Sequence, residues 1–227
     1  MRGRDRTVAL AMLAVVGSSP AADGGATVES AAGAIGIASS AESPALVGGR
    51  YVVAATGNEV RYRVREQLVG FDLPNDAIGK SAQIIGGITL DDSGRVVREA
   101  SRFTVDAATF VSDRDRRDNY VRGRLLTAAQ HPTIELVPTV LRGLAMPPSG
   151  SATFQLVGDL TVRGVTRPTT WSVTAQFKDE AVTGSASTRF AFTDFEMEKP
   201  RVRSVLSVAD TIALEYDFNL VREAPSP

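Results

Sequence analysis

The chain has 227 residues, with 22% charged and 43% hydrophobic, an ordinary balance for one globular domain with additional segments. A net charge of −1 excludes the basic field of most nucleic-acid-binding domains, so we expect no nucleic-acid partner. The lack of cysteine excludes disulfides, zinc–thiolate sites and thiol nucleophiles.

Residues 1–21 have the layout of a secretory signal peptide. A short basic start, MRGRDR, precedes an apolar run from Thr7 to Gly17, and small residues stand at −3 and −1 if cleavage follows Ala21. The run is too short to span a bilayer. We therefore expect cleavage and an extracytoplasmic protein, periplasmic or secreted. A retained anchoring helix or a wrong start codon is the alternative.

Residues 22–48 are dominated by Ala, Gly and Ser and contain no aromatic residue. Such a segment cannot bury enough surface to offset its chain entropy, which predicts a flexible linker. Its functional interpretation is a tether that holds the following domain away from a membrane or a cell wall.

From residue 50 onward the hydrophobic pattern has period two, which is typical of β-strands with one buried face. Short turns at 91–95, 163–168 and 178–182 leave no room for crossover helices and favour antiparallel hairpins. Eight such strands form either a sandwich or a closed barrel, and periodicity does not choose between them. The eight predicted strands are 58–68, 82–90, 96–105, 132–141, 152–162, 170–177, 181–192 and 211–220.

Four motifs in different parts of the domain, two of which overlap at His131 and Pro132, resemble the YceI-like family. They are FQLVGDLTVRGVTRPTTWSV (Phe154 to Val173), HPTIELVPT (His131 to Thr139), SVADTIALEYDFNL (Ser207 to Leu220) and RRDNYVRGRLLTAAQHP (residues 116–132). The last is similar to the family's helical connection into the fourth strand. The resemblance implies a YceI-like domain at 49–223, an all-β, eight-stranded, antiparallel, lipocalin-like barrel with a short helical connection.

The resemblance also implies a function. Family members enclose a long apolar chain, typically a polyisoprenoid or an isoprenoid quinone, so the expected partner is a polyprenyl chain. No catalytic residues come with the family, and we expect a binding protein and not an enzyme. We also expect no cofactor and no metal, because one histidine and no cysteine leave only carboxylates as ligands. Transient membrane contact and a monomer or homodimer are compatible with this interpretation. Glu66, the longer connection at 69–81 and Glu196 depart from the common family pattern near the expected barrel rims.

Twelve residues are in phase with the apolar faces of their strands, and we expect them to line the ligand cavity. Two of the twelve, Gly184 and Ala186, are small, and so are three further residues in the same phase, Gly86, Gly158 and Ala175. Small inward residues favour space inside the barrel. A secreted structural or stress-response protein with a packed core is the alternative, and a barrel-site isomerase or hydratase is less favoured. The twelve are Tyr62, Phe103, Phe154, Leu156, Trp171, Val173, Gly184, Ala186, Phe190, Leu214, Tyr216 and Phe218.

Residues 116–132 carry a dense set of charges and the only histidine, His131. A serine hydrolase needs a nucleophile, a base and an orienting group within reach, and no G-x-S-x-G motif occurs. DRDRRD (residues 113–118) superficially suggests a calcium loop, but Arg116, Arg117 and the missing glycine oppose it. We therefore interpret the segment as a connection, a lid or rim helix without catalytic function.

Two further groups of charged residues have two interpretations each. Arg61, Arg63 and Arg65 project to one side of a strand, either as a ridge for anionic lipid headgroups or as a solvated face with ion-pair partners on the neighbouring strand. Glu66 and Glu99 lie in the apolar phase, either as a general acid and base or as residues that reach the rim or pair with an arginine. We favour the second interpretation in both cases.

Overall fold

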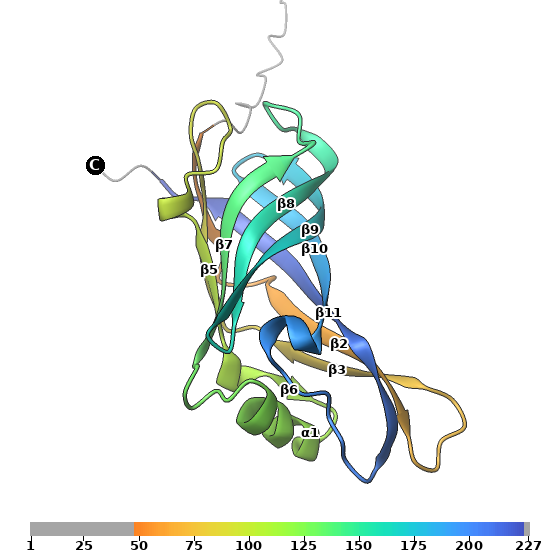
Figure 1. The fold of residues 1–227 in the computed structure, drawn as a ribbon. Helices are drawn as coiled ribbons and strands as arrows, with labels where there is room; N and C mark the ends of the chain where they lie inside the picture. Colours follow the sequence, from red (N-terminus) through yellow and green to blue (C-terminus); the bar gives the residue numbers. More distant parts are fainter. Residues whose placement is uncertain (1–47, 225–227) are drawn as a thin grey trace, which may run out of the picture. The chain divides into compact units, whose positions relative to one another are not determined.

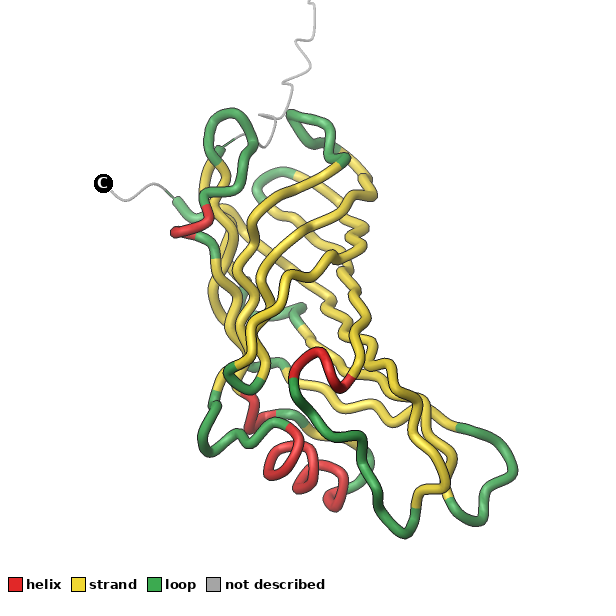
Figure 2. Tube along the Cα trace, viewed as in Figure 1, coloured by secondary structure: helices red, strands yellow, loops and turns green. Residues whose placement is uncertain are grey.

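The computed structural model describes residues 48–224. The expected signal peptide and the expected linker up to residue 47 lie outside the described residues. Within 48–224, no helix combines the length and apolar composition needed to cross a membrane. The strands of this part are β1 Gly49–Val53, β2 Glu59–Leu68, β3 Asn75–Ser81, β4 Ile84–Leu90, β5 Arg102–Asp106, β6 Val111–Ser112, β7 Thr133–Arg142, β8 Gly150–Val162, β9 Val165–Lys178, β10 Ala181–Ala191 and β11 Val205–Arg222 (Figures 1 and 2).

The helical elements are short. The single α-helix described, α1, precedes a π-helical turn, η3, and both lie in the connection from β6 to β7. This agrees with the predicted short helical connection. The elements are η1 Arg98–Ala100, η2 Ala107–Thr109, α1 Asp115–Tyr120, η3 Val121–Leu125 and η4 Phe192–Phe195.

The sheet closes into an eight-stranded antiparallel barrel, as predicted. Its strands follow the order β1-β4-β5-β7-β8-β9-β10-β11, and β11 returns to pair with β1. Strands β2, β3 and β6 continue the sheet from the first part of β11 and extend beyond the barrel wall (Figure 1). We call the extension formed by β2, β3 and the first part of β11 the arm.

Strand β11, with 18 residues, connects the arm to the barrel. Its residues 205–217 pair with β2, and its last three residues pair with β1. The chain from β1 to β2 is therefore one strand interrupted at residues 54–58. In the same way β3 and β4 form an interrupted strand beside it, followed by β5 and β6. The eight predicted strands thus correspond one to one with eight long strands, of which the first three are broken.

The predicted boundaries were wrong in several places. The segment expected to be a connection, 69–81, contains strand β3. Its buried positions carry the small residues Ala77, Gly79 and Ser81, so the sequence shows little apolar alternation there and does not indicate a strand. A Cβ on Gly79 would lie 2.3 Å from ring atoms of Tyr62, so only glycine allows this ring to cover the strand. The turn expected at 163–168 consists only of residues 163 and 164, because β9 begins at residue 165. The strand predicted at 96–105 contains the short helix η1, and only its last part is strand β5.

The core lies inside the barrel, where the inward side chains of the strands meet. Leu160, Trp171 and Val173 are buried there, and Phe192 and Phe195 of η4 belong to the same core cluster. Because the outward positions of the same strands are mostly polar, each strand separates the core from water. The interior of the barrel is therefore filled by apolar side chains, and any cavity lies between them.

Candidate ligand-binding site

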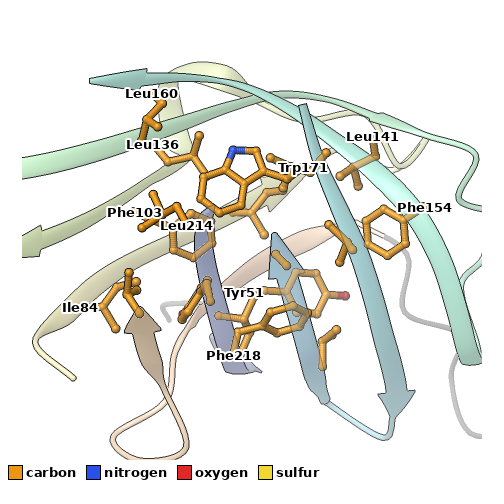
Figure 3. A pocket seen from close by; sticks show the side chains of 18 of the residues that line it. Tyr51, Ile84, Phe103, Leu136, Leu141, Phe154, Leu160, Trp171, Leu214 and Phe218 are labelled. Atoms are coloured by element: carbon orange, nitrogen blue, oxygen red, sulfur yellow. The ribbon is translucent and has the colours of Figure 1, made fainter. Parts of the chain in front are cut away.

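An apolar cavity of about 130 Å³ lies inside the barrel (Figure 3). Its wall consists of apolar side chains from all eight barrel strands together with Val60 of β2, Phe110, and Leu144 and Pro148 of the connection between β7 and β8. We call it the inner cavity. Nine of the twelve expected residues line it: Phe103, Phe154, Leu156, Trp171, Val173, Ala186, Leu214, Tyr216 and Phe218.

The inner cavity holds few free polar groups. The indole Nε1 of Trp171 donates a hydrogen bond to Thr169 Oγ1 at 3.0 Å, and the Tyr216 hydroxyl donates to Asn58 Oδ1 at 2.8 Å. The hydroxyl of Tyr51 is buried and has no hydrogen-bond partner among the described residues. Burial raises the pKa of Tyr51 and of Tyr216, so both phenols are neutral at physiological pH.

The size of the inner cavity limits what it can hold. A dry apolar cavity of about 150 Å³ binds a benzene ring. At about 130 Å³ the inner cavity accommodates one small ring or a few methylene groups, and not a long chain. A ligand of the expected kind needs additional space.

A larger pocket of about 810 Å³ lies between the end of the barrel, α1 and the arm. We call it the end pocket. Its apolar wall includes Val64 and Leu68 of β2, Val121 next to α1, Met197 and Val208. Its volume is typical of small-molecule sites, which occupy roughly 300–1,000 Å³. Phe110, Ile134 and Leu214 line both spaces, so the two are adjacent and share a wall.

The twelve expected residues therefore do not all line one space: nine line the inner cavity, two line only the end pocket, and one lines neither. Tyr62 and Phe190 line the end pocket, and Leu214 lines both spaces. Gly184 lines neither, because it lies where two strands approach closely: a Cβ there would stand 2.1 Å from the carbonyl oxygen of Thr174 and 2.8 Å from Phe218 Cζ. Gly184 permits close packing and does not provide space for a ligand.

A buried ion pair forms part of the wall of the end pocket. Arg117 Nη2 of α1 lies 2.6 Å from Glu66 Oε1 of β2, and the side chains are 13% and 8% exposed. Arg117 also contacts Asp113. The arginine-paired interpretation of Glu66 is thus confirmed, whereas Glu99 is exposed in η1. The two carboxylates are not a catalytic pair.

The connection at 116–132 is held by hydrogen bonds. The buried carboxylate of Asp118 accepts hydrogen bonds from the backbone nitrogen and the hydroxyl of Ser112 at 2.8 and 2.6 Å, which attaches α1 to β6.

His131 packs at the turn after β8, where a Cβ on Gly164 would be 2.9 Å from its ring, and it lines neither space. No group of three metal-ligating side chains occurs within residues 48–224.

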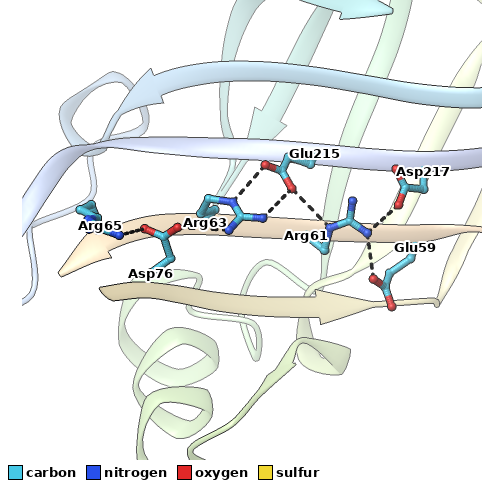
Figure 4. A network of polar contacts seen from close by, with 7 residues as sticks. All are labelled: Glu59, Arg61, Arg63, Arg65, Asp76, Glu215 and Asp217. Carbon is cyan, nitrogen blue, oxygen red and sulfur yellow. Dashed lines mark hydrogen bonds and ion pairs between the residues drawn. The ribbon is translucent and has the colours of Figure 1, made fainter. Parts of the chain in front are cut away.

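The arginines of β2 have ion-pair partners on the neighbouring strands, as the solvated-face interpretation predicted (Figure 4). Arg61 bonds Asp217 and Glu215 of β11, and Arg63 lies between Glu215 and Asp76 of β3. Arg65 also pairs with Asp76. Hydrogen bonds from Arg63 and Arg61 lower the pKa of Glu215.

Sequence reasoning missed most of the end pocket. The sequence places Arg117 in a charged connection without catalytic function and gives no reason to expect it in a pocket wall, and Met197 and Val205 lie outside all predicted strands. The one available signal was the group Val202, Val205 and Val208, whose three-residue spacing does not fit the period of two of a regular strand. The register of β11 against β2 shifts between residues 205 and 207 and again between 208 and 212.

Comparisons with known proteins agree with this architecture. A family model described as the YceI-like domain matches residues 51–220. No curated protein matches the chain. Three similar solved structures, at or below 18% identity, share the fold.

The first is a polyisoprenoid binding domain from Saccharophagus degradans implicated in plant cell wall breakdown, with 12% identity and a TM-score of 0.58, covering 76% of this chain and 98% of that one. The second is BcnA of Burkholderia cenocepacia, with 18% identity and a TM-score of 0.53, covering 73% and 96%. The third is a mutant YceI protein of Campylobacter jejuni with a monobromobimane guest, with 16% identity and a TM-score of 0.51, covering 70% and 94%.

Proposed function

Because this chain belongs to the YceI-like family, we propose that it is a binding protein for a long apolar chain, such as a polyisoprenoid or an isoprenoid quinone. The observation that carries the proposal is the adjacency of the inner cavity and the end pocket, which share Phe110, Ile134 and Leu214. One end of the chain occupies the inner cavity, and the remainder lies in the end pocket.

The chemistry of the walls supports an apolar ligand. An isoprenoid chain has no hydrogen-bonding groups along its length, so its affinity must come from burial, at roughly 25 cal/mol per Å² of apolar surface. The aliphatic and aromatic wall of the inner cavity offers this burial. The polar side chains of the end pocket, including Arg114, Arg116 and Arg203, suit a ligand whose exposed end is polar.

We also propose that the protein acts outside the cytoplasm and binds its ligand without converting it. The apparent signal peptide at residues 1–21 supports export. Sequencing the N-terminus of protein from the extracytoplasmic fraction should give a start close to Ala22. Intact Met1 on cytosolic protein would contradict this part of the proposal.

The binding proposal is tested by organic extraction and mass spectrometry of protein purified from its own host. We expect an apolar chain in a fixed molar ratio to the protein, and native mass spectrometry of the intact complex should show the same added mass. An extract without any apolar compound, combined with no binding of added polyprenyl ligands, would instead support a protein with a packed core and no ligand.

A further inference from the structure

Exposed apolar side chains gather at the free end of the arm. Between residues 48 and 224, ten large hydrophobic residues are exposed, and five of them belong to two neighbouring segments, 69–74 and 202–206. The most exposed are Leu73 at 78%, Leu206 at 66% and Phe71 at 59%. We call this group the apolar tip; it consists of Val69, Phe71, Leu73, Val202 and Leu206.

The two segments form one surface. The backbone nitrogen of Val69 donates a hydrogen bond to the Ser204 oxygen at 3.1 Å, and Leu68 pairs with Val205 across the sheet. In Figure 1 the turn after β2 and the chain entering β11 both lie at the far end of the arm. Single exposed apolar residues need no explanation, but several of them on two neighbouring, hydrogen-bonded segments mark an interaction surface.

The apolar tip adjoins the end pocket. Leu68, Val202 and Val205 line the end pocket, and each belongs to or directly precedes a segment of the tip. The apolar wall of the pocket therefore continues onto the exposed surface. A chain that leaves the pocket on this side meets apolar side chains before it meets water.

The charges around the tip favour an anionic partner. In the sequence, the two segments of the tip and their immediate neighbours contain three cations, Lys199, Arg201 and Arg203, and two carboxylates, Glu198 and Asp72. Among the described residues, Arg201 and Arg203 have no acidic partner, unlike the paired arginines of β2. Exposed apolar side chains next to unpaired cations are typical of surfaces that bind anionic lipid headgroups.

We propose that the apolar tip docks this protein on the surface of an anionic lipid bilayer, with the end pocket next to the membrane. Phe71 and Leu73 enter the boundary between headgroups and acyl chains, while Arg201 and Arg203 contact lipid phosphates. The role of this contact rests on the proposed function, because it lets an apolar ligand move between bilayer and pocket without crossing water. The docking itself is measurable without any ligand.

The test is co-sedimentation of the protein, in the form isolated from the cell, with vesicles containing phosphatidylglycerol. All variants keep the same N-terminus, so any contribution from it is common to them. The variant with both Phe71→Ser and Leu73→Ser should bind at least about tenfold more weakly, because each side chain loses its apolar burial. The matched control is Ile85→Ser on β4, which is 70% exposed and lies outside the tip. It should bind within about twofold of the wild type.

The charge component has its own test. The variant with both Arg201→Gln and Arg203→Gln should lose binding to phosphatidylglycerol vesicles but bind pure phosphatidylcholine vesicles like the wild type. High salt should reproduce that loss with the wild-type protein. Equal binding of the wild type and the tip variant, or an equal loss in the Ile85 control, would overturn the proposal. The proposal would also be overturned if the wild type bound no vesicles and light scattering showed a dimeric wild type but monomeric tip variants.

Ligand transfer separates this inference from the proposed function. A polyprenyl ligand supplied in detergent micelles should bind the tip variant and the wild type equally, whereas transfer from vesicles should be slower for the tip variant. A wild type that binds vesicles but takes no ligand from micelles or vesicles refutes the proposed function and leaves the docking in place.

Discussion

Arg117 of α1 and Glu66 of β2 form a buried ion pair, with 2.6 Å between Nη2 and Oε1. The two residues are far apart in the sequence, so this contact holds the helical connection against the arm and shapes the wall of the end pocket. Its energetic consequence follows from the burial of both charges.

Removing one partner of this pair should be costly. Arg117→Met leaves the Glu66 carboxylate buried without its partner, and we expect a loss of about 3–5 kcal/mol in the free energy of unfolding. Adding Glu66→Leu to this variant should recover much of that loss. The exposed Arg65→Ala change, by contrast, should cost at most about 1 kcal/mol. Urea denaturation measures all four proteins, and a double variant no more stable than Arg117→Met would contradict the argument.

The unpaired hydroxyl of Tyr51 predicts an unusual result for a core substitution. Tyr51→Phe removes a buried polar group that has no partner, so the free energy of unfolding should stay equal or rise by up to about 1 kcal/mol. Tyr216→Phe is the matched control, because it deletes the hydrogen bond to Asn58 and should lower stability by about 0.5–1.5 kcal/mol. Thermal or urea unfolding distinguishes the two, and equal losses would show that Tyr51 has a partner in solution.

Gly184 should not tolerate even a methyl group. A Cβ at this position would lie 2.1 Å from the Thr174 carbonyl oxygen, so Gly184→Ala forces the strands apart. We expect a loss of about 1–3 kcal/mol in the free energy of unfolding, as for other overpacked sites. The neighbouring Ser185 is exposed, and Ser185→Ala should be nearly neutral in the same measurement. A stable Gly184→Ala protein would mean that β9 and β10 are farther apart than described.

Filling either space should weaken ligand binding. Ala186→Phe fills the inner cavity and Val208→Phe narrows the end pocket. At roughly 25 cal/mol per Å², losing roughly 60 Å² of contact costs about 1.4 kcal/mol, or tenfold in affinity. Quenching or shift of Trp171 fluorescence reports on the inner cavity, and the outward Ser185→Phe is the control. If both filled variants stay folded and bind a polyprenyl ligand like the wild type, the chain lies elsewhere.

The ion pairs of the arm predict how stability depends on pH. Hydrogen bonds from Arg63 and Arg61 lower the pKa of Glu215, and those from Arg65 and Arg63 lower the pKa of Asp76. Each carboxylate therefore stabilises the fold above its unfolded pKa, about 4.3 for Glu and 3.9 for Asp. This contribution is lost as the pH falls through the lowered folded values.

We thus expect the free energy of unfolding to decrease as the pH is lowered below about 4, which urea titrations at a series of pH values can measure. Glu215→Gln should be less stable than the wild type at neutral pH, and the two should converge in acid. A constant difference between them across this pH range would show that Glu215 is not the group responsible.

The strands were predictable because alternation of apolar and polar residues directly encodes a strand with one buried face, whereas the choice of a barrel over a sandwich came from the resemblance to the YceI-like family. That signal failed at β3, where the small residues Ala77 and Gly79 are buried and the Tyr62 ring covers Gly79. The end pocket was not predictable for a different reason. Its wall combines α1, β2 and the first part of β11, and only the three-dimensional fold brings them together. The buried Arg117 pairs with Glu66, which lies far from it in the sequence, and a single charge run cannot reveal such a partner.

The pairing of β1 with β11 joins the two ends of the domain. Arg222 donates a hydrogen bond to the Gly48 oxygen, across a sequence separation of 174 residues. Contacts of this range must wait for the whole chain, so folding of this barrel should be slow compared with that of a helical domain of equal size. Until β11 arrives, β1 and β10 expose unpaired backbone groups along open edges, where incomplete chains associate with one another. The nascent protein must therefore be kept from associating with its own copies until β11 has been synthesised and has closed the ring.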